Sequence, residues 1–391
     1  MNRIQPFLVC LILFISSGLT RADKVVRPTL KNSARLCAIL SFLFIGAIAS
    51  VKGDGTLETV FSDPTYQFVG VAVTPNSRIF VNYPYWQDKH KYSVVEVAKD
   101  GTVKPFPNET WNSFKKGEDG KNKFVCVQAV YADDEGFLWI VDPAGIGLGD
   151  VYDHAAKVVK VDLKTNQIVR IYRFADSVAG LKSYLNDIRI DTNRGFAYLT
   201  SSSNGGIVVL NIRTGASRFL LHGHPSTISD PSYHFSTDGK ELATAQGPTK
   251  IKSDGIALSP DGQWLYYKPL TDDKLYRAKA SLLRDFTTTE KQVEAGVQDL
   301  GHFVATDGME MDHDGNLYVG DIENDRIVKI SPDLKMTTLV QDKDKLIWPD
   351  SYSIANGFLY ISCSQIQFMP RFNNGSDLTH FPYQVYRLKV Q

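Results

Sequence analysis

The 391-residue chain contains few cysteines. Of its four, Cys10 and Cys37 lie in apolar N-terminal runs, so only Cys126 and Cys363 remain for the rest of the chain. Neither belongs to a C-x-x-C pair or to a Cys/His spacing typical of zinc sites. A disulfide-rich scaffold is therefore excluded, and the two remaining cysteines leave open either one disulfide or two buried thiols.

An excess of charge of one sign is also absent. The 43 basic and 43 acidic residues balance, but residues 1–49 hold six of the basic residues and one of the acidic ones. The rest of the chain keeps 37 basic and 42 acidic residues, a net charge of about −5. A basic footprint for nucleic acid is therefore not expected, whereas a mildly acidic body can attract cationic ligands.

Hydrophobic runs long enough to span a membrane are lacking as well, because a spanning helix needs about 20 apolar residues. Two shorter runs, 7–15 and 36–51, follow basic residues and end near small-residue patterns at 20–22 and 47–49. This arrangement is typical of secretory signals. We expect residues 1–49 to be a targeting segment, cleaved near Ala49, and the protein to be secreted without a stable membrane span. A retained signal anchor is the alternative, and which run is the signal stays open.

Helical periodicity is missing from the body of the chain, except for one short helix expected at 280–285. In its place are short β-branched or aromatic runs separated by turns rich in Asp, Asn and Gly, which is typical of strands. Six of these runs share one register, each as the second strand of a repeated unit. They are residues 78–81, 137–141, 196–200, 264–267, 316–319 and 358–362.

The repeated units predict an all-β fold, a six-bladed β-propeller over residues 50–391. Spaced copies of a four-stranded unit are typical of propellers. Residues 57–61 precede the first copy, so we expect this N-terminal strand to complete the last blade and close the ring, which removes exposed strand edges. A two-domain β-sandwich protein is the alternative. The copies begin at residues 69, 128, 187, 254, 307 and 350.

In a propeller the innermost strands begin at one mouth of the central channel, so equivalent positions converge on a ring. Four carboxylates in such a ring repel each other unless a divalent cation, a bound ammonium or a shared proton compensates. Oxygen donors without cysteine favour Ca²⁺ over Zn²⁺, and we take Asp187, Asp254 and Asp307 as the candidate metal ligands. Single members could instead only accept N–H bonds from their own turns. The candidate ligand-binding residues are Gln128, Asn186, Asp187, Asp254, Asp307 and Asp350, with Val69 as the sixth ring position.

Aromatic residues occur close to the ring positions, at 83–86, Trp348, Phe368 and Phe372. They would suit an amine or an aromatic ligand through cation–π and stacking contacts, and packing between blades is the alternative. The acidic turns at 133–135 and 312–315 are different, since we expect them to be solvated β-turns. The second of them is too short for an EF-hand loop.

An ordered series of segments resembles the major royal jelly protein and yellow family, in its microbial branch. The resemblance covers essentially residues 57–388 and implies a secreted six-bladed propeller. The functions it implies range from dopachrome conversion to the binding of biogenic amines or lipids. The segments include Gly70-Val-Ala-Val73, Pro105-Phe-Pro-Asn108, Leu138-Trp-Ile-Val-Asp142, Gly223-His-Pro-Ser226 and Ser253-Asp-Gly-Ile-Ala-Leu-Ser-Pro260.

A second resemblance is to the gluconolactonase and senescence-marker propellers. Asp254-Gly255 and Asp307-Gly308-Met309 look like their metal-site strands, and Asn186-Asp187 looks like their substrate-contacting pair. This resemblance implies a divalent cation, with Asp307 as both ligand and catalytic base. Their Asn ligand is replaced by Asp254, and their Glu ligand falls at Val69, which cannot bind a metal.

The sequence therefore predicts a secreted propeller that binds a small cationic or aromatic molecule at an acidic channel mouth. An enzyme at the same site is the alternative, either a Ca²⁺-dependent lactonase-like hydrolase with Asp307 as base or a dopachrome-type isomerase. The ligand class would be an amine, a catechol or a lactone. An interaction scaffold that uses the outer blade faces is the third possibility.

Overall fold

The computed structural model describes residues 55–390. The chain divides into a unit of residues 1–50 and a unit of residues 51–391, and the fold is that of the second unit. The apolar runs, the cleavage patterns, Cys10 and Cys37 lie outside the described residues. Among residues 55–390, no helix is long and apolar enough to cross a membrane.

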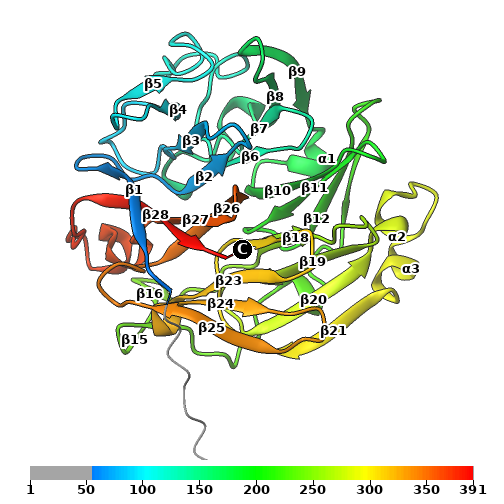
Figure 1. The fold of residues 1–391 in the computed structure, drawn as a ribbon. Coiled ribbons are helices and arrows are strands. Elements are labelled where there is room, and N and C mark those ends of the chain that lie inside the picture. Colours follow the sequence, from blue (N-terminus) through cyan, green and yellow to red (C-terminus); the bar gives the residue numbers. More distant parts are fainter. Residues whose placement is uncertain (1–54, 391) are drawn as a thin grey trace, which may run out of the picture. The chain divides into compact units, whose positions relative to one another are not determined.

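Six four-stranded antiparallel sheets are arranged as the blades of a propeller, so the predicted fold is confirmed (Figure 1). The strands of each sheet are given from the inside outward. The first sheet contains β2 (Gly70–Val73), β3 (Ile79–Asn82), β4 (Val94–Val97) and β5 (Val103–Pro105). The second contains β6 (Ala129–Ala132), β7 (Phe137–Asp142), β8 (Lys157–Asp162) and β9 (Gln167–Arg173), and the third contains β10 (Leu185–Asp191), β11 (Phe196–Ser201), β12 (Ile207–Asn211) and β13 (Ser217–Leu220). The next two contain β18 (Ser253–Leu258), β19 (Trp264–Pro269), β20 (Lys274–Lys279) and β21 (Val297–His302); and β22 (Met309–Met311), β23 (Leu317–Asp321), β24 (Arg326–Ile330) and β25 (Met336–Gln341).

The sixth sheet closes the ring with strands from both ends of the described chain. It contains β26 (Pro349–Ala355), β27 (Phe358–Cys363), β28 (Tyr383–Lys389) and, outermost, β1 (Glu58–Asp63). In Figure 1 the blue β1 lies beside the red β28, and the two strands pair antiparallel from Glu58 opposite Arg387 to Asp63 opposite Tyr383. The predicted closure by an N-terminal strand is therefore confirmed.

Helices are short and lie in the connections. The expected helix at 280–285 is α2 (Ala280–Arg284), in the connection between β20 and β21. The other α-helices are α1 (Asp176–Ala179) and α3 (Glu290–Glu294), and the 3-10 turns are η1 (Ile146–Leu148), η2 (Tyr152–His154), η3 (Pro225–Thr227), η4 (Ile322–Asn324), η5 (Ile366–Phe368) and η6 (Pro370–Phe372).

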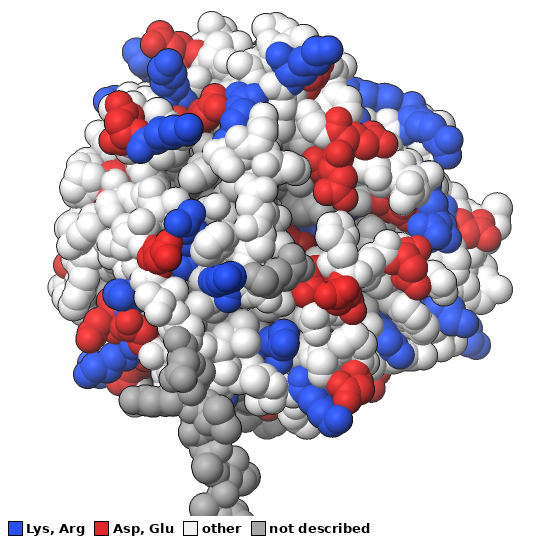
Figure 2. All heavy atoms as spheres, viewed as in Figure 1, with Lys and Arg blue, Asp and Glu red and all other residues white. Residues whose placement is uncertain are grey.

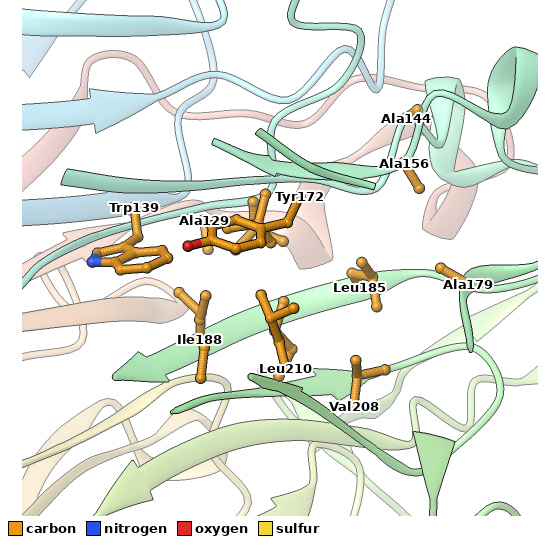
Figure 3. Packing of buried hydrophobic residues seen from close by; sticks show 14 of the residues in the cluster. Ala129, Trp139, Ala144, Ala156, Tyr172, Ala179, Leu185, Ile188, Val208 and Leu210 are labelled. Atoms are coloured by element: carbon orange, nitrogen blue, oxygen red, sulfur yellow. The ribbon is translucent and has the colours of Figure 1, made fainter. Parts of the chain in front are cut away.

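The core consists of side chains packed between neighbouring blades. Between the second and third blades, Trp139 of β7 stacks on Tyr172 of β9 with ring centroids 5.9 Å apart. Ile188 and Leu210 of the third blade belong to the same buried cluster (Figure 3). Burial of such side chains contributes about 1.5–3 kcal/mol each, so the blades stabilise one another through these faces. Cys126 and Cys363 are free, buried thiols, which decides between the two alternatives.

The expectation that the acidic turns are solvated is wrong for their first residues. Asp133 and Asp312 are each only 4% exposed. Asp312 accepts the backbone N–H of Asp314 at 3.0 Å and the hydroxyl of Tyr318 at 2.9 Å. Asp133 accepts in the same way from Trp139 Nε1 at 2.7 Å. These carboxylates fix the turn to the second strand of the blade, because the aromatic donor lies on that strand.

Replacing Tyr318 with phenylalanine should therefore destabilise the protein by about 1 kcal/mol, the net value of one hydrogen bond. The effect is modest because Asp312 keeps its bonds to Asn316 and to the turn backbone. Urea unfolding measures it, with Tyr66→Phe as the control, since no hydrogen bond to the Tyr66 hydroxyl is found among the described residues. Equal stability of the two variants would contradict the assigned role of Asp312.

A long connection lies between β13 and β18, where the sequence spacing of the copies is widest. It contains η3 and two short hairpins, β14 (Ser236–Thr237) with β15 (Lys240–Glu241), and β16 (Ala243–Thr244) with β17 (Gly247–Pro248). Its residues Phe235 and Leu242 pack in one buried cluster with Trp348 and Met369 from other blades. We call residues 229–252 the cap segment.

Candidate functional site

Two aspartates begin the innermost strands of the fourth and fifth blades and lie close together. Asp254 is the second residue of β18, and Asp307 stands two residues before β22. Each is followed by a glycine, because the next blade lies too close to leave room for a side chain at that position. A Cβ at Gly255 would lie 2.6 Å from the Asp307 carbonyl oxygen, and one at Gly308 would lie 2.6 Å from that of Asp350. The repeated Asp-Gly pair therefore marks the places where innermost strands converge.

The carboxyl groups of Asp254 and Asp307 share a hydrogen bond and titrate together. Burial is the largest cause that raises the pKa of Asp254 well above its usual value, and the charges of Asp307, Asp350 and Asp187 raise it further. Burial also raises the pKa of Asp307, to about 6, although the hydrogen bonds from Asp254 and Trp348 lower it. Burial and mutual repulsion therefore favour a pair that carries one proton and one negative charge, with Asp307 as the more acidic member.

Polar partners fix both carboxyl groups in place. Asn186 Nδ2 donates to Asp254 Oδ2 at 2.5 Å, and Trp348 Nε1 donates to Asp307 Oδ2 at 2.7 Å. The Trp348 ring packs edge-on against Phe235, with centroids 5.7 Å apart. Because Phe235 belongs to the cap segment, one tryptophan connects the acidic pair to the cap.

The pair forms part of a cleft of about 400 Å³ at this mouth of the channel. Four of the six predicted ligand-binding residues line it, namely Gln128, Asn186, Asp254 and Asp307. Tyr184 also lines the cleft, and its hydroxyl donates to Gln128 Oε1 at 2.9 Å and accepts from Trp86 Nε1 at 2.8 Å. The other lining residues come from the cap segment and from the loops of several blades; they include Trp86, Lys182, Ser183, Thr249, Lys250, Arg371 and Phe372.

The structure does not place the two remaining candidates, Asp187 and Asp350, among the residues that line the cleft. Asp187 Oδ2 accepts from Arg189 at 2.9 Å. Asp350 is 5% exposed, and its Oδ2 has no hydrogen-bond partner among the described residues. Both carboxylates still raise the pKa of Asp254, so the four aspartates interact electrostatically. Asn186, not Asp187, is the second residue of its innermost strand, as Asp254 and Asp350 are of theirs, so the predicted ring position in the third blade is wrong by one residue. A direct ligand role for these two stays a prediction.

A buried ion cluster near the ring was missed at the sequence level. The Arg189 guanidinium lies 2.9 Å from Asp187 and 3.4 Å from Glu310, and 5.1 Å from the centre of the Tyr131 ring. The signal was present, because residues 187 and 189 of one strand point to the same side. Arg189 compensates part of the ring's negative charge, which the sequence interpretation assigned to a ligand or to a shared proton.

Calcium binding stays a prediction. Among residues 55–390, no three His, Cys, Asp or Glu side chains are grouped so that they could hold a metal ion. The donors at the acidic pair are already engaged, Asp254 with Asn186 and Asp307 with Trp348. With one oxygen of each carboxylate engaged and no third acidic ligand grouped with them, the described residues do not by themselves form a Ca²⁺ site.

The face of the molecule drawn in Figure 2 carries mixed charge. On the face that Figure 2 draws, blue basic and red acidic side chains are interspersed among uncharged residues. Such mixing produces no strong field of one sign. Selection of a charged ligand would therefore depend on local groups such as those in the cleft.

Comparison with known proteins identifies the family. The sequence model described as "Major royal jelly protein" matches residues 125–391. The chain belongs to the major royal jelly protein family. This confirms the resemblance found in the sequence, and it agrees with the propeller architecture. Membership does not by itself assign a ligand or a reaction.

Curated relatives of this family member include protein yellow from Drosophila guanche and from Drosophila melanogaster. Each is 24% identical over 233 residues, which cover 55% of this chain. The match covers only 39% and 41% of the relatives' own lengths. What those proteins do as wholes therefore reaches this chain only as a proposal.

Solved structures with the same fold include a gluconolactonase from Xanthomonas campestris, with a TM-score of 0.52 and 14% identity over 88% of this chain and 93% of that chain. A luciferin-regenerating enzyme has a TM-score of 0.50 and 13% identity over 86% of this chain and 95% of that chain. At these identities the likeness shows the propeller fold alone.

Proposed function

We propose that this member of the major royal jelly protein family is an exported protein that binds a small molecule with an ammonium group and an aromatic body. The observation that carries the proposal is the buried Asp254–Asp307 pair in the cleft. Burial and repulsion favour a single negative charge on this pair, and no ion pair to either carboxylate is found among the described residues. A ligand cation would supply the missing counter-charge.

The surroundings of the pair favour an organic cation. Lys268 is a buried basic residue whose charge lowers the pKa of Asp307. Its Nζ, however, donates to the carbonyl oxygens of Pro269 at 2.8 Å and Asp272 at 2.6 Å. Trp86, Tyr184 and Phe372 supply aromatic surface in the same cleft. Ring faces and edges of this kind stack on aromatic ligands and attract ammonium groups.

Binding of tryptamine and tyramine, measured by titration calorimetry at pH 7.5, tests the proposal. We expect Asp307→Asn to weaken binding at least tenfold, because the variant removes the charge that faces the ligand. Asp350→Asn is the matched control, a buried ring carboxylate outside the cleft, and should weaken binding less than threefold. Binding should also weaken below pH 6, where Asp307 takes up a proton.

Two results would contradict the proposal. One is the absence of binding by both amines. The other is an equal loss in the Asp307 and Asp350 variants, which would place the ligand outside the cleft.

An enzyme at the same site is the second candidate, and the pKa of about 6 at Asp307 favours it. A carboxyl group with a pKa near the working pH suits proton transfer. Turnover of a δ-lactone or of dopachrome, lost in Asp307→Asn, would support this candidate. A further dependence of turnover or thermal stability on Ca²⁺ would support the hydrolase version.

A further inference from the structure

The cleft contains as many basic as acidic side chains. Asp150, Asp254 and Asp307 line it, and so do Lys182, Lys250 and Arg371. A purely cationic ligand would not pair with any of these basic groups. A basic group that has no partner in the protein would indicate an additional, acidic group on the ligand.

Two of the three basic side chains have partners. Lys182 Nζ lies 2.7 Å from Asp150 Oδ2, in an exposed ion pair. Lys250 Nζ donates to the carbonyl oxygens of Asp230, at 3.3 Å, and of Tyr233. Both lysines are thus held at the edge of the cleft by groups of the protein.

Arg371 differs from them. Among residues 55–390, no hydrogen bond or ion pair to its guanidinium is found. The guanidinium lies 5.5 Å from the centre of the Phe372 ring, and partial burial lowers the pKa of Arg371. Because an arginine presents five N–H donors in a planar fork, it is suited to bind a carboxylate through two of them.

The backbone that carries Arg371 is fixed. Arg371 is the middle residue of η6, and Asn373 Nδ2 donates to the carbonyl oxygens of Gln367 at 2.8 Å and Met369 at 3.0 Å. Met369 belongs to the buried cluster that also contains Phe235 and Leu242 of the cap segment. The exposed side chain of Arg371 therefore lines the cleft from a fixed backbone at the rim, while the buried Asp254 and Asp307, 3% and 5% exposed, lie deeper.

We propose that the ligand is bipolar, with its ammonium group at Asp307 on the floor and a carboxylate at Arg371 on the rim. This inference rests on the proposed function, since it extends the same site. An aromatic amino acid or a close derivative has this pattern of charge, with a body that the aromatic side chains can contact. Arg371 is then a specificity-determining residue that separates amino acids from amines.

Unsatisfied hydroxyl groups in the same cleft are consistent with a polar ligand. Ser183 is 2% exposed, and its Oγ has no partner among the described residues. Thr249 Oγ1 is also without a partner there. A buried hydroxyl that lacks a hydrogen bond is costly, and a ligand carboxylate or amine can supply that bond.

Calorimetric titration of two matched pairs tests this inference, tryptamine against L-tryptophan and tyramine against L-tyrosine. The members of each pair differ by the carboxylate. We expect the wild-type protein to bind the amino acid at least fivefold more tightly than the amine. Arg371→Met should remove this preference and leave the affinity for the amine within twofold. Arg371→Lys should keep part of it, and Lys104→Met, at an exposed lysine outside the cleft, should leave it unchanged.

The outcomes separate this inference from the proposed function. Equal affinity of the wild-type protein for amine and amino acid would overturn the bipolar ligand and leave amine binding intact. A preference that persists in Arg371→Met would overturn the role of Arg371. No binding of any of the four probes would overturn both proposals. Thermal unfolding of each variant within about 2 °C of wild type serves as the check on folding.

Discussion

Replacing Asp254 with asparagine is expected to stabilise the ligand-free protein at neutral pH. Burial and neighbouring carboxylates hold the pKa of Asp254 well above its usual value. The folded protein therefore takes up a proton at pH 7 that the unfolded chain does not hold, which costs stability. Asparagine is neutral at every pH, and its amide can still accept from Asn186 and donate to Asp307.

The pH dependence has a definite sign. For a carboxyl group with a raised folded pKa, stability is fully present below the unfolded pKa of about 3.9 and is lost as pH rises through the folded pKa. We expect wild type and Asp254→Asn to be equally stable near pH 4. At pH 7 the variant should be more stable by up to about 4 kcal/mol, because pH 7 lies about three units above the unfolded pKa and each unit corresponds to about 1.4 kcal/mol.

Thermal and urea unfolding between pH 4 and pH 8 measure this difference, with the exposed Asp88→Asn as the control. A variant that is less stable than wild type at pH 7 would show that repulsion and burial do not dominate at Asp254. Amine binding should survive in Asp254→Asn, because the negative charge lies mainly on Asp307. Loss of binding in this variant would place the charge on Asp254 instead.

Removing Asp142 should destabilise the protein by about 3–5 kcal/mol, the usual effect of breaking a buried ion pair. Asp142 Oδ2 lies 2.8 Å from Lys157 Nζ, and both side chains are fully buried. Asp142 also accepts the backbone N–H groups of Val125, Cys126 and Ala144. Alanine at this position would leave a buried charge and three buried donors without partners.

The double variant Asp142→Ala/Lys157→Met is the matched control, measured with both single variants by urea unfolding. It removes the buried charge as well as its partner, so it should be more stable than Asp142→Ala alone. Strict additivity of the two single effects would show that the ion pair contributes nothing beyond its separate groups. A loss below about 0.5 kcal/mol in Asp142→Ala would contradict the structural role of the pair.

The sequence predicted the fold because its signals are local and repeated. Each blade contains a strand, a turn rich in Asp or Gly, and a second strand with aromatic residues. Six copies of this unit in one register indicate a closed ring. Closure by the N-terminal strand followed from the same count. The buried turn carboxylates were misjudged, because the partner of Asp312 lies on the next strand and its burial comes from packing.

The sequence also predicted that Gln128, Asp254 and Asp307 lie at one mouth of the channel, because equivalent strand positions converge in a propeller, and these residues line one cleft together with Asn186. Only the tertiary structure decided which groups surround them. Arg189, which pairs with Asp187 of its own strand, also reaches Glu310 of another blade, and Arg371 enters the cleft from a loop. Such placements depend on how loops fold over the ring and on which charges become buried together, and neither leaves a periodic pattern in the sequence.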